Sequence, residues 1–504
     1  MSGIADKSPQ ERSSIARSDS SLSHDKEEAL LGSSGSHHDI TRVFSTFDVF
    51  CMSFNVVSVV PSIASVLVFS IPGGGTHGMI WAWLVCGVFL TVISLAVAEA
   101  SSVANNKTVS QSSFGRILSW VAGYATAVGN IANVASVAWA CALQIMAAAM
   151  IGSGFMFQPS TAQTYGIFCG LLILQGLACS IKPTILARLQ APFLVLSFSL
   201  WLALIVTLPA STSPNFNTEK FVFGTFTNVN KAWSDNVFAF LLTFLSPLWA
   251  IGRATSISHI SEESRNIKSV PFAIVISTAT TALMAWVLNI ALAFCMGNDL
   301  RAILFSKSGE PFATILLNSF STRGMLATWT FIIILQFNMG LTMLRNTSRQ
   351  LSAFAKEGAF KCDPLFTHLT SLTHSQRTRT LNPEIWSPII LSILFGLLAF
   401  AGSNAVCRTL FSTAVVSQFV AQTIFIWRSR RESDKANFSL GILSLPAATA
   451  SSIVMVVLSI ILVFPDTEHP TGGTMNYTLA ILAGTLALSL GDFYFSSKTI
   501  SVAR

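Results

Sequence analysis

The stretch "LLTFLSPLWAIGRATSISHISEESRN" (241–266) gives the strongest indication of the fold. It begins as an apolar run that could form most of a membrane-spanning helix, and it becomes polar within a few residues. Gly252 and the cation Arg253 lie side by side at this change. A charge at the centre of an isolated membrane helix costs about 3 kcal/mol even on the insertion scale. A span that carries one is therefore expected to unwind there and to face a wet cavity.

The composition places the rest of the chain in a membrane as well. Of the 504 residues, 52% are hydrophobic and 11% are charged, and the mean hydropathy is +0.62. A soluble protein of this length needs a much larger charged surface. Runs of about 20 apolar residues can cross a bilayer, and the clearest are 80–100, 270–296, 452–464 and 478–495. The sequence predicts an all-α multi-pass membrane protein with about 12 transmembrane helices.

The basic residues indicate how the spans are oriented. The net charge is +7, but its placement follows the topology and does not indicate nucleic-acid binding. Most basic side chains fall in the N-terminal tail, in alternate loops and at the C-terminus, for example Lys107, Lys182, Lys268, Arg349 and Arg430. Loops rich in Lys and Arg stay in the cytoplasm. Both termini are therefore predicted to be cytoplasmic, which requires an even number of spans.

The residues that could carry chemistry are scattered. The eight cysteines form no CxxC pair, so neither a metal site nor a disulfide framework is predicted. The eight histidines lie almost entirely in loops or in the tail. A membrane-embedded enzyme would need clustered His, Asp or Glu inside the spans. We predict no enzyme activity, no catalytic residues, no metal and no cofactor.

Two parts of the chain differ sharply in composition. Residues 1–44 are rich in Ser, Gly and charged residues and almost free of aromatic residues. Such a segment cannot bury enough apolar surface to order itself. We predict a disordered cytoplasmic tail over 1–44, either a phosphorylated trafficking segment or a plain solvated one. Residues 45–504 are predicted to form one transporter domain.

The first span has a weak point of its own. In "SFNVVSVVPSIASVLVFSIPGGG" (53–75), Pro61 stands between small polar residues in mid-membrane. Proline removes a backbone donor and blocks the preceding turn, and lipid cannot satisfy the groups that are freed. Interrupted first and sixth spans are typical of inverted-repeat transporters, in which half-helix ends point at a midplane site. We therefore predict a five-plus-five inverted repeat with broken first and sixth spans.

Several longer motifs resemble one family. "LSPLWAIGRATSISHISEESRNIKSVPFAI" (245–274) resembles the sixth-span signature of the fungal GABA/choline-type permeases of the amino acid–polyamine–organocation (APC) superfamily. "LQFNMGLTMLRNTSRQLSAFAKEGAF" (335–360) resembles the eighth-span signature of that family. "GGGTHGMIWAW" (73–83), "LSWVAGY" (118–124), "KFVFG" (220–224), "LFSTA" (410–414) and "MNYT" (475–478) are similar to further landmarks in the same order. The resemblance extends from about residue 44 to the end.

The resemblance implies a secondary active transporter. Its substrate would be an amino acid or a related amine, taken up with protons as a symporter. The partners would be that small molecule, protons and the lipid bilayer, with no nucleic acid. The plasma membrane is the implied location, with the vacuolar or another internal membrane as the alternative.

The chain departs from the family pattern where the charge matters. Arg253, Ala254 and Thr255 stand where the family usually has Ala-Phe-Asp, and Ala138 replaces an acidic residue in the third span. The family's Pro-Thr-Ser-Gly-Gly-Leu-Tyr box is replaced by "SSVANNKTVSQSSFGR" (101–116). At 4 Å one unit charge is worth roughly 1 to 4 kcal/mol. We therefore expect permanent cations to be disfavoured, and a carboxylate to be favoured because a guanidinium can bind it in a bidentate manner.

The predicted substrate site combines the two broken spans. The carboxylate of the substrate would meet backbone N–H groups near Pro61, and its amine would meet carbonyls near Gly252. The asparagines of the third and eighth spans are weaker candidates, since such amides more often bind neighbouring helices. The predicted substrate-binding residues are Val60, Pro61, Ser62, Ala64, Asn133, Trp249, Ile251, Gly252, Arg253, Ala254, Thr255 and Asn338.

The candidates for coupling or gating are Glu99, Arg253 and Glu262. Arg253 is expected to lie at the site or on a gate, paired with an acid such as Glu99. Glu99 itself lies at the cytoplasmic end of the second span, so it is either a proton carrier or an interface anchor. Two alternatives stay open: a choline, GABA or polyamine permease, and a transporter-like nutrient sensor that does not translocate.

Overall fold

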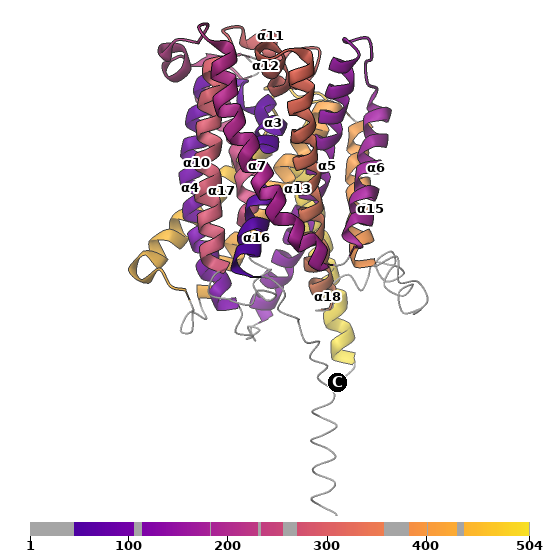
Figure 1. Cartoon of the computed structure of the whole chain (residues 1–504). Coiled ribbons are helices and arrows are strands. Elements are labelled where there is room, and N and C mark those ends of the chain that lie inside the picture. Colours follow the sequence, from indigo (N-terminus) through magenta and orange to yellow (C-terminus); the bar gives the residue numbers. More distant parts are fainter. Residues whose placement is uncertain are drawn as a thin grey trace, which may run out of the picture. The chain divides into compact units, whose positions relative to one another are not determined.

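A chain of apolar helices, separated by short connections, makes up the computed structural model of the protein (Figure 1). The structure describes residues 45–104, 113–181, 183–229, 233–255, 270–356, 383–400, 402–430 and 438–502. Residues Val43–Arg504 form one compact unit. The predicted tail over 1–44 lies outside the described residues, as do Glu262 and residues 105–112, half of the segment that replaces the family box after the second span.

The helices and strands follow one another from the first span to the last. Their bounds are α2 Thr46–Val57, α3 Val59–Ser70, β1 Gly73–Gly74, α4 Gly75–Ala104, α5 Ser113–Gly152, α6 Thr161–Cys179, α7 Pro183–Thr212, the π-helix η1 Lys220–Gly224, β2 Thr227–Asn228, α8 Asn236–Leu242, α9 Leu245–Gly252, α10 Val270–Cys295, α11 Leu300–Leu304, α12 Pro311–Ser319, α13 Thr322–Lys356, α15 Pro383–Gly396, the 3₁₀-helix η4 Leu397–Phe400, α16 Ser403–Arg430, the 3₁₀-helix η6 Gly441–Leu443, α17 Ser444–Val463 and α18 Thr478–Val502.

The number of spans agrees with the prediction. Within the described part of the chain, ten helical segments are long and apolar enough to cross a membrane, and two shorter apolar helices cover Glu384–Phe400 and Thr478–Tyr494. Together they account for about 12 spans, where α2 with α3 forms the first and α8 with α9 the sixth. The all-α multi-pass fold is confirmed.

Equivalent spans of the two halves pack against each other. The contacts pair α3 with α9, α4 with α10, α5 with α13 and α6 with α15. These are the first, second, third and fourth spans, each with the span five places later. Such pairing is what an inverted repeat of five spans produces. The helices α11 and α12 lie together at one end of the bundle, which we call the α12 end (Figure 1, top).

The first span is broken three residues before Pro61. Ser58 has a left-handed backbone with φ 41° and ends α2, and α3 begins at Val59. Pro61 is therefore the third residue of α3, a position whose backbone N–H would have no acceptor within the helix. The interruption predicted in the turn before Pro61 is present, and Ser58 carries the change of backbone direction.

The sixth span repeats this arrangement. α8 ends at Leu242, turns at Thr243 and Phe244, and resumes as α9, whose third residue is Pro247. α9 ends at Gly252, and one 3₁₀ turn covers Arg253–Thr255. The interruption expected at Gly252 is present, and a second one lies nine residues before it.

A small ribbon joins the two halves at the α12 end. β1 pairs antiparallel with β2, so that Gly73 lies opposite Asn228. A Cβ on Gly73 would stand 2.0 Å from the carbonyl oxygen of Ala239 in α8. Only glycine fits this contact. Gly73 therefore allows the backbone of α8 to pack directly against the ribbon.

Candidate functional site

The two broken spans meet at Arg253 and Ser62. Arg253 follows α9, and its Nη2 donates to Ser62 Oγ at 2.8 Å and to the carbonyl oxygen of Ala250 at 3.3 Å. Ser62 Oγ in turn donates to the carbonyl oxygen of Val57, the last residue of α2. The carbonyl left over at the first break is thus linked through one hydroxyl to the guanidinium at the second break. This linkage explains how a charge is tolerated at this depth.

Arg253 lies on the face of an aromatic ring. Its Cζ is 3.8 Å from the centroid of Trp249, and Arg253 is 1% exposed. A desolvated cation–π contact contributes about 2 kcal/mol or more. The other face of Trp249 stacks on Phe411 of α16 with centroids 4.2 Å apart, and Phe69 of α3 packs on Phe411 at 5.5 Å. We call Arg253, Trp249, Phe411 and Phe69 the central stack.

A hydrogen bond fixes the orientation of the indole. Trp249 Nε1 donates to Ser136 Oγ of α5 at 3.0 Å, and Ser136 Oγ donates to the carbonyl oxygen of Asn133 at 2.9 Å. Because the ring cannot rotate without losing this bond, the face that carries Arg253 is held in place. The third span therefore positions the central stack.

Two cavities lie on opposite sides of the central stack. One, of about 580 Å³, is lined by Phe69, Phe411 and residues of the α11–α12 segment. The other, of about 300 Å³, is lined by Thr255 and Gln418. Phe411 and Gln418 are seven residues apart on α16, about 10 Å along its axis. The central stack is thus a partition roughly two helical turns thick between the two cavities.

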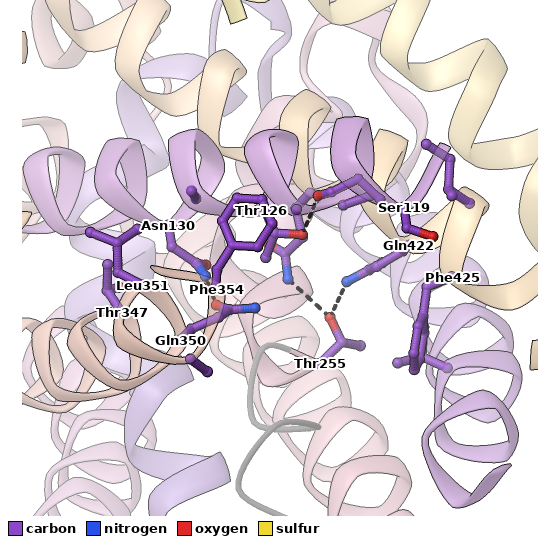
Figure 2. A pocket seen from close by; sticks show the side chains of 18 of the residues that line it. Ser119, Thr126, Asn130, Thr255, Thr347, Gln350, Leu351, Phe354, Gln422 and Phe425 are labelled. Atoms are coloured by element: carbon purple, nitrogen blue, oxygen red, sulfur yellow. Dashed lines mark hydrogen bonds between the residues drawn. The ribbon is translucent and has the colours of Figure 1, made fainter. Parts of the chain in front are cut away.

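The smaller cavity, which we call the inner cavity, is lined by apolar side chains, by amides and hydroxyls, and by Arg428. Figure 2 shows several of these residues. Gln418 and Gln422 of α16 both donate to Thr255 Oγ1, at 3.1 and 2.6 Å, and Thr255 Oγ1 donates to the carbonyl oxygen of Gly252 at 2.8 Å. On its other wall Asn130 donates to Gln350. Thr255 therefore ties the end of α9 to α16 directly below Arg253.

The larger cavity, which we call the vestibule, is lined by three charged residues, Glu310, Arg408 and Asp466. Arg408 of α16 forms an ion pair with Asp466, with Nη1 and Oδ1 2.7 Å apart. Glu310, the residue before α12, lines the same vestibule and is 7% exposed. Burial raises the pKa of Glu310 to about 8. The vestibule therefore contains a titratable carboxyl near neutral pH.

The predicted substrate residues of the broken spans lie together in the partition. Val60, Ser62, Ala64, Trp249, Ile251, Gly252, Arg253, Ala254 and Thr255 are all buried. Of these, Thr255 is the one that lines a cavity. The carbonyl of Ile251 accepts the N–H of Arg253, and the carbonyl of Gly252 accepts Thr255, so both groups expected to bind the amine are occupied.

The two asparagines are also buried in the helix bundle. Asn133 has no hydrogen-bond partner for its side-chain amide among the described residues, and the same holds for the Oδ1 atom of Asn338. Neither residue lines the vestibule or the inner cavity. Their place as substrate ligands stays a prediction.

Glu99 does not form the ion pair that was expected for it. Its carboxylate accepts the N–H of Leu440 at 3.2 Å and the hydroxyl of Ser444 at 2.7 Å, at the start of α17. A carboxylate at a helix start is stabilised by the helix dipole. The predicted pairing of Arg253 with Glu99 was wrong, because Glu99 anchors the eleventh span. Glu262 lies outside the described residues.

Sequence reasoning missed Glu310, Gln418 and Gln422. The glutamines stand seven and eleven residues after Phe411, and a helical projection of α16 would have placed them on the face of Phe411. Glu310 stands in a polar loop, where nothing in the local sequence indicates burial.

Comparison with known proteins identifies the chain. The sequence profile of the family described as amino acid permease matches residues 44–486. The chain belongs to the amino acid permease family. The resemblance to fungal permeases of the APC superfamily is confirmed, and the protein is a membrane transporter and not an enzyme.

Its relatives cover nearly the whole length. An uncharacterized amino-acid permease of Schizosaccharomyces pombe is 29% identical over 484 residues, 93% of this chain and 86% of the relative. The GABA-specific permease of Saccharomyces cerevisiae is 29% identical over 483 residues, 92% of this chain and 83% of its own. Amino-acid permease 2 of Neurospora crassa is 23% identical over 472 residues, 90% of this chain and 84% of its own.

Proposed function

We propose that this permease takes up a small amino acid with a free carboxylate, together with protons, into the cytoplasm. The observation that carries the proposal is Arg253 stacked on Trp249 and bonded to Ser62 at the junction of the two broken spans. A carboxylate that reaches the partition could take guanidinium N–H bonds in place of Ser62 Oγ. Arginine suits this exchange because its planar fork matches a carboxylate.

The same geometry disfavours choline and polyamines. A quaternary ammonium is usually bound on aromatic faces. One face of Trp249 already carries the Arg253 guanidinium and the other carries Phe411. A permanent cation would therefore meet a positive charge and an occupied ring. A zwitterion such as GABA, which one relative is named for, offers a carboxylate instead.

The proposed orientation follows the basic loops. Both termini and the inner cavity would face the cytoplasm, and the α12 end with the vestibule would face outward. The plasma membrane is the proposed location. Localisation of a C-terminal fluorescent fusion, with protease protection of the tag in right-side-out vesicles, tests both statements.

Uptake in cells that lack their own permeases tests the substrate. The panel contains neutral and acidic amino acids, GABA, choline and a polyamine, with Arg253→Ala and Arg253→Lys run in parallel. We expect saturable uptake of an amino acid, at least tenfold weaker in Arg253→Ala, which is about 1.4 kcal/mol. Arg253→Lys should recover part of it, since the charge remains but the fork is lost.

Other outcomes have definite meanings. Choline uptake by the wild type that persists in Arg253→Ala would contradict the prediction that Arg253 disfavours permanent cations. Substrate binding without accumulation, measured on the purified protein, would support the nutrient-sensor alternative. Abundance of each variant at the cell surface is the control for folding.

A further inference from the structure

Glu310 is a buried carboxyl that the proposed binding of substrate does not use. Its backbone is well held, because its N–H donates to Ser308 Oγ at 3.4 Å and its carbonyl accepts Thr314 Oγ1 at 3.2 Å. Among the described residues its carboxylate has neither a hydrogen bond nor an ion pair, although Glu310 is 7% exposed and lines the vestibule. A carboxylate so placed is costly in its charged form.

The neighbouring charges do not compensate Glu310. Arg408 is already paired with Asp466 across the vestibule. The helix α3, which packs on α12, carries no ionisable side chain. Among the described side chains, the other ionisable groups on the helices packed against α12 are Asp299 and Arg301 at the start of α11, Arg323 of α13, Arg345 and Arg349 at the far end of α13, Arg188 of α7 and Cys295 of α10. Lys307 lies between α11 and α12, and Cys407 of α16 lines the vestibule. Arg301, Lys307 and Arg323 are exposed and form no ion pair with Glu310.

We propose that Glu310 is the group that takes up the transported proton from the outer solution, which rests on the proposed proton-coupled uptake. The carboxylate gains H⁺ from water in the vestibule and becomes a neutral carboxyl. With Arg408 at +1 and Asp466 at −1, this changes the vestibule from a net charge of −1 to zero. A neutral vestibule repels an incoming substrate carboxylate less, so proton binding would precede substrate binding.

The raised pKa supports this order. Burial raises the pKa of Glu310 to about 8, so the group is protonated below that pH and charged above it. Uptake that needs neutral Glu310 is therefore fully present at acidic pH and is lost as the outer pH rises through about 8. An exposed acid with an ordinary pKa would give no such loss in this range.

A proton titration tests the proposal without any substrate. The full chain in lipid nanodiscs is titrated between about pH 6 and pH 10, beside Glu310→Gln and the control Glu468→Gln. Glu468 is exposed on the same side and bonds to Ser234. Between about pH 10 and pH 6 we expect Glu310→Gln to take up about one proton fewer than the wild type, and Glu468→Gln to match the wild type. Equal proton binding by the wild type and Glu310→Gln would overturn the proposal.

Transport then tests the role in coupling. With whichever amino acid the uptake panel identifies, Glu310→Gln should exchange substrate in counterflow at a rate within about threefold of the wild type, which also shows that it is folded. It should no longer accumulate substrate against a gradient, and its rate should not change between pH 6 and 9. Accumulation with an unchanged pH profile would overturn the proposal. Glu310→Asp, which keeps the acid, should restore both properties. If no amino acid is taken up, the titration still decides whether Glu310 binds the proton.

Discussion

At the scale of single residues, Thr255 is the point at which the sixth span is tied to the tenth. Its hydroxyl donates to Gly252 and accepts from Gln418 and Gln422. One oxygen thus binds one group at the end of α9 and two groups on α16. If the inner cavity is to reach the substrate site, these bonds must break first. We therefore expect Thr255 to act as a latch, a contact that must open before the inner cavity connects to the site.

Replacing this hydroxyl tests the latch. Thr255→Val keeps the shape but removes the acceptor for both glutamines, while Thr255→Ser keeps it. We expect Thr255→Val to favour the state open to the inner cavity, raising counterflow at least twofold and lowering the melting temperature by a few degrees. Thr255→Ser should resemble the wild type. Slower counterflow in Thr255→Val, with normal surface abundance, would show that the latch does not limit opening.

At the scale of helices and strands, most of the fold could be predicted from the sequence. The spans follow from apolar runs of bilayer length, and the break at Gly252 follows from a glycine beside a charge. The position of the first break could not be predicted. Pro61 indicates an interruption in the turn before it, but nothing in the local sequence distinguishes Ser58 as the residue that adopts the left-handed backbone.

The candidate site was less predictable because it depends on contacts between distant segments. The side chains of Ser62 and Arg253 are 191 residues apart in the chain, and nothing local indicates their bond. The expected partner Glu99 has the right charge to pair with Arg253. In the folded chain, however, its carboxylate binds Ser444 at the start of α17 instead. Charge alone identified Arg253, and packing decided what it binds.

The β1–β2 ribbon supplies a test at this scale. Gly73→Ala places a Cβ against the backbone of α8 at 2.0 Å, and neither backbone can move without disturbing the ribbon. We expect a drop of several degrees in melting temperature and reduced uptake, because α8 positions the sixth span. Gly166→Ala is the control, since a Cβ there meets nothing within 4 Å. A Gly73→Ala protein as stable as Gly166→Ala would show that the ribbon is loosely held.

At the scale of the whole molecule, two cavities separated by one partition fit alternating access. The vestibule and the inner cavity are lined by different segments of the same helices, α5 and α16. Movement of the two halves about the central stack would connect each cavity to the site in turn. The substrate site would then be open to only one side of the membrane at a time.

Cysteine labelling tests this arrangement and the orientation together. In a background without native cysteines, which must include replacement of Cys407 in the vestibule, Ser306→Cys and Thr126→Cys report the two cavities. We expect a membrane-impermeant thiol reagent to label Ser306→Cys from outside and Thr126→Cys only from the cytoplasmic side. Labelling of both Ser306→Cys and Thr126→Cys from outside would contradict the partition. Labelling of Thr126→Cys only from outside and of Ser306→Cys only from the cytoplasmic side would reverse the orientation.

The buried guanidinium of Arg253 has a consequence for the response to membrane voltage. Moving one elementary charge across the whole membrane is worth about 2.3 kcal/mol per 100 mV. A shift of Arg253 by one helical turn, about 5.4 Å, covers roughly a fifth of a hydrocarbon layer of about 30 Å. The field would then change the energy of this step by only about 0.4 kcal/mol per 100 mV. Arg253 can therefore carry a full charge through each transport cycle while leaving the opening of the partition almost insensitive to the membrane potential.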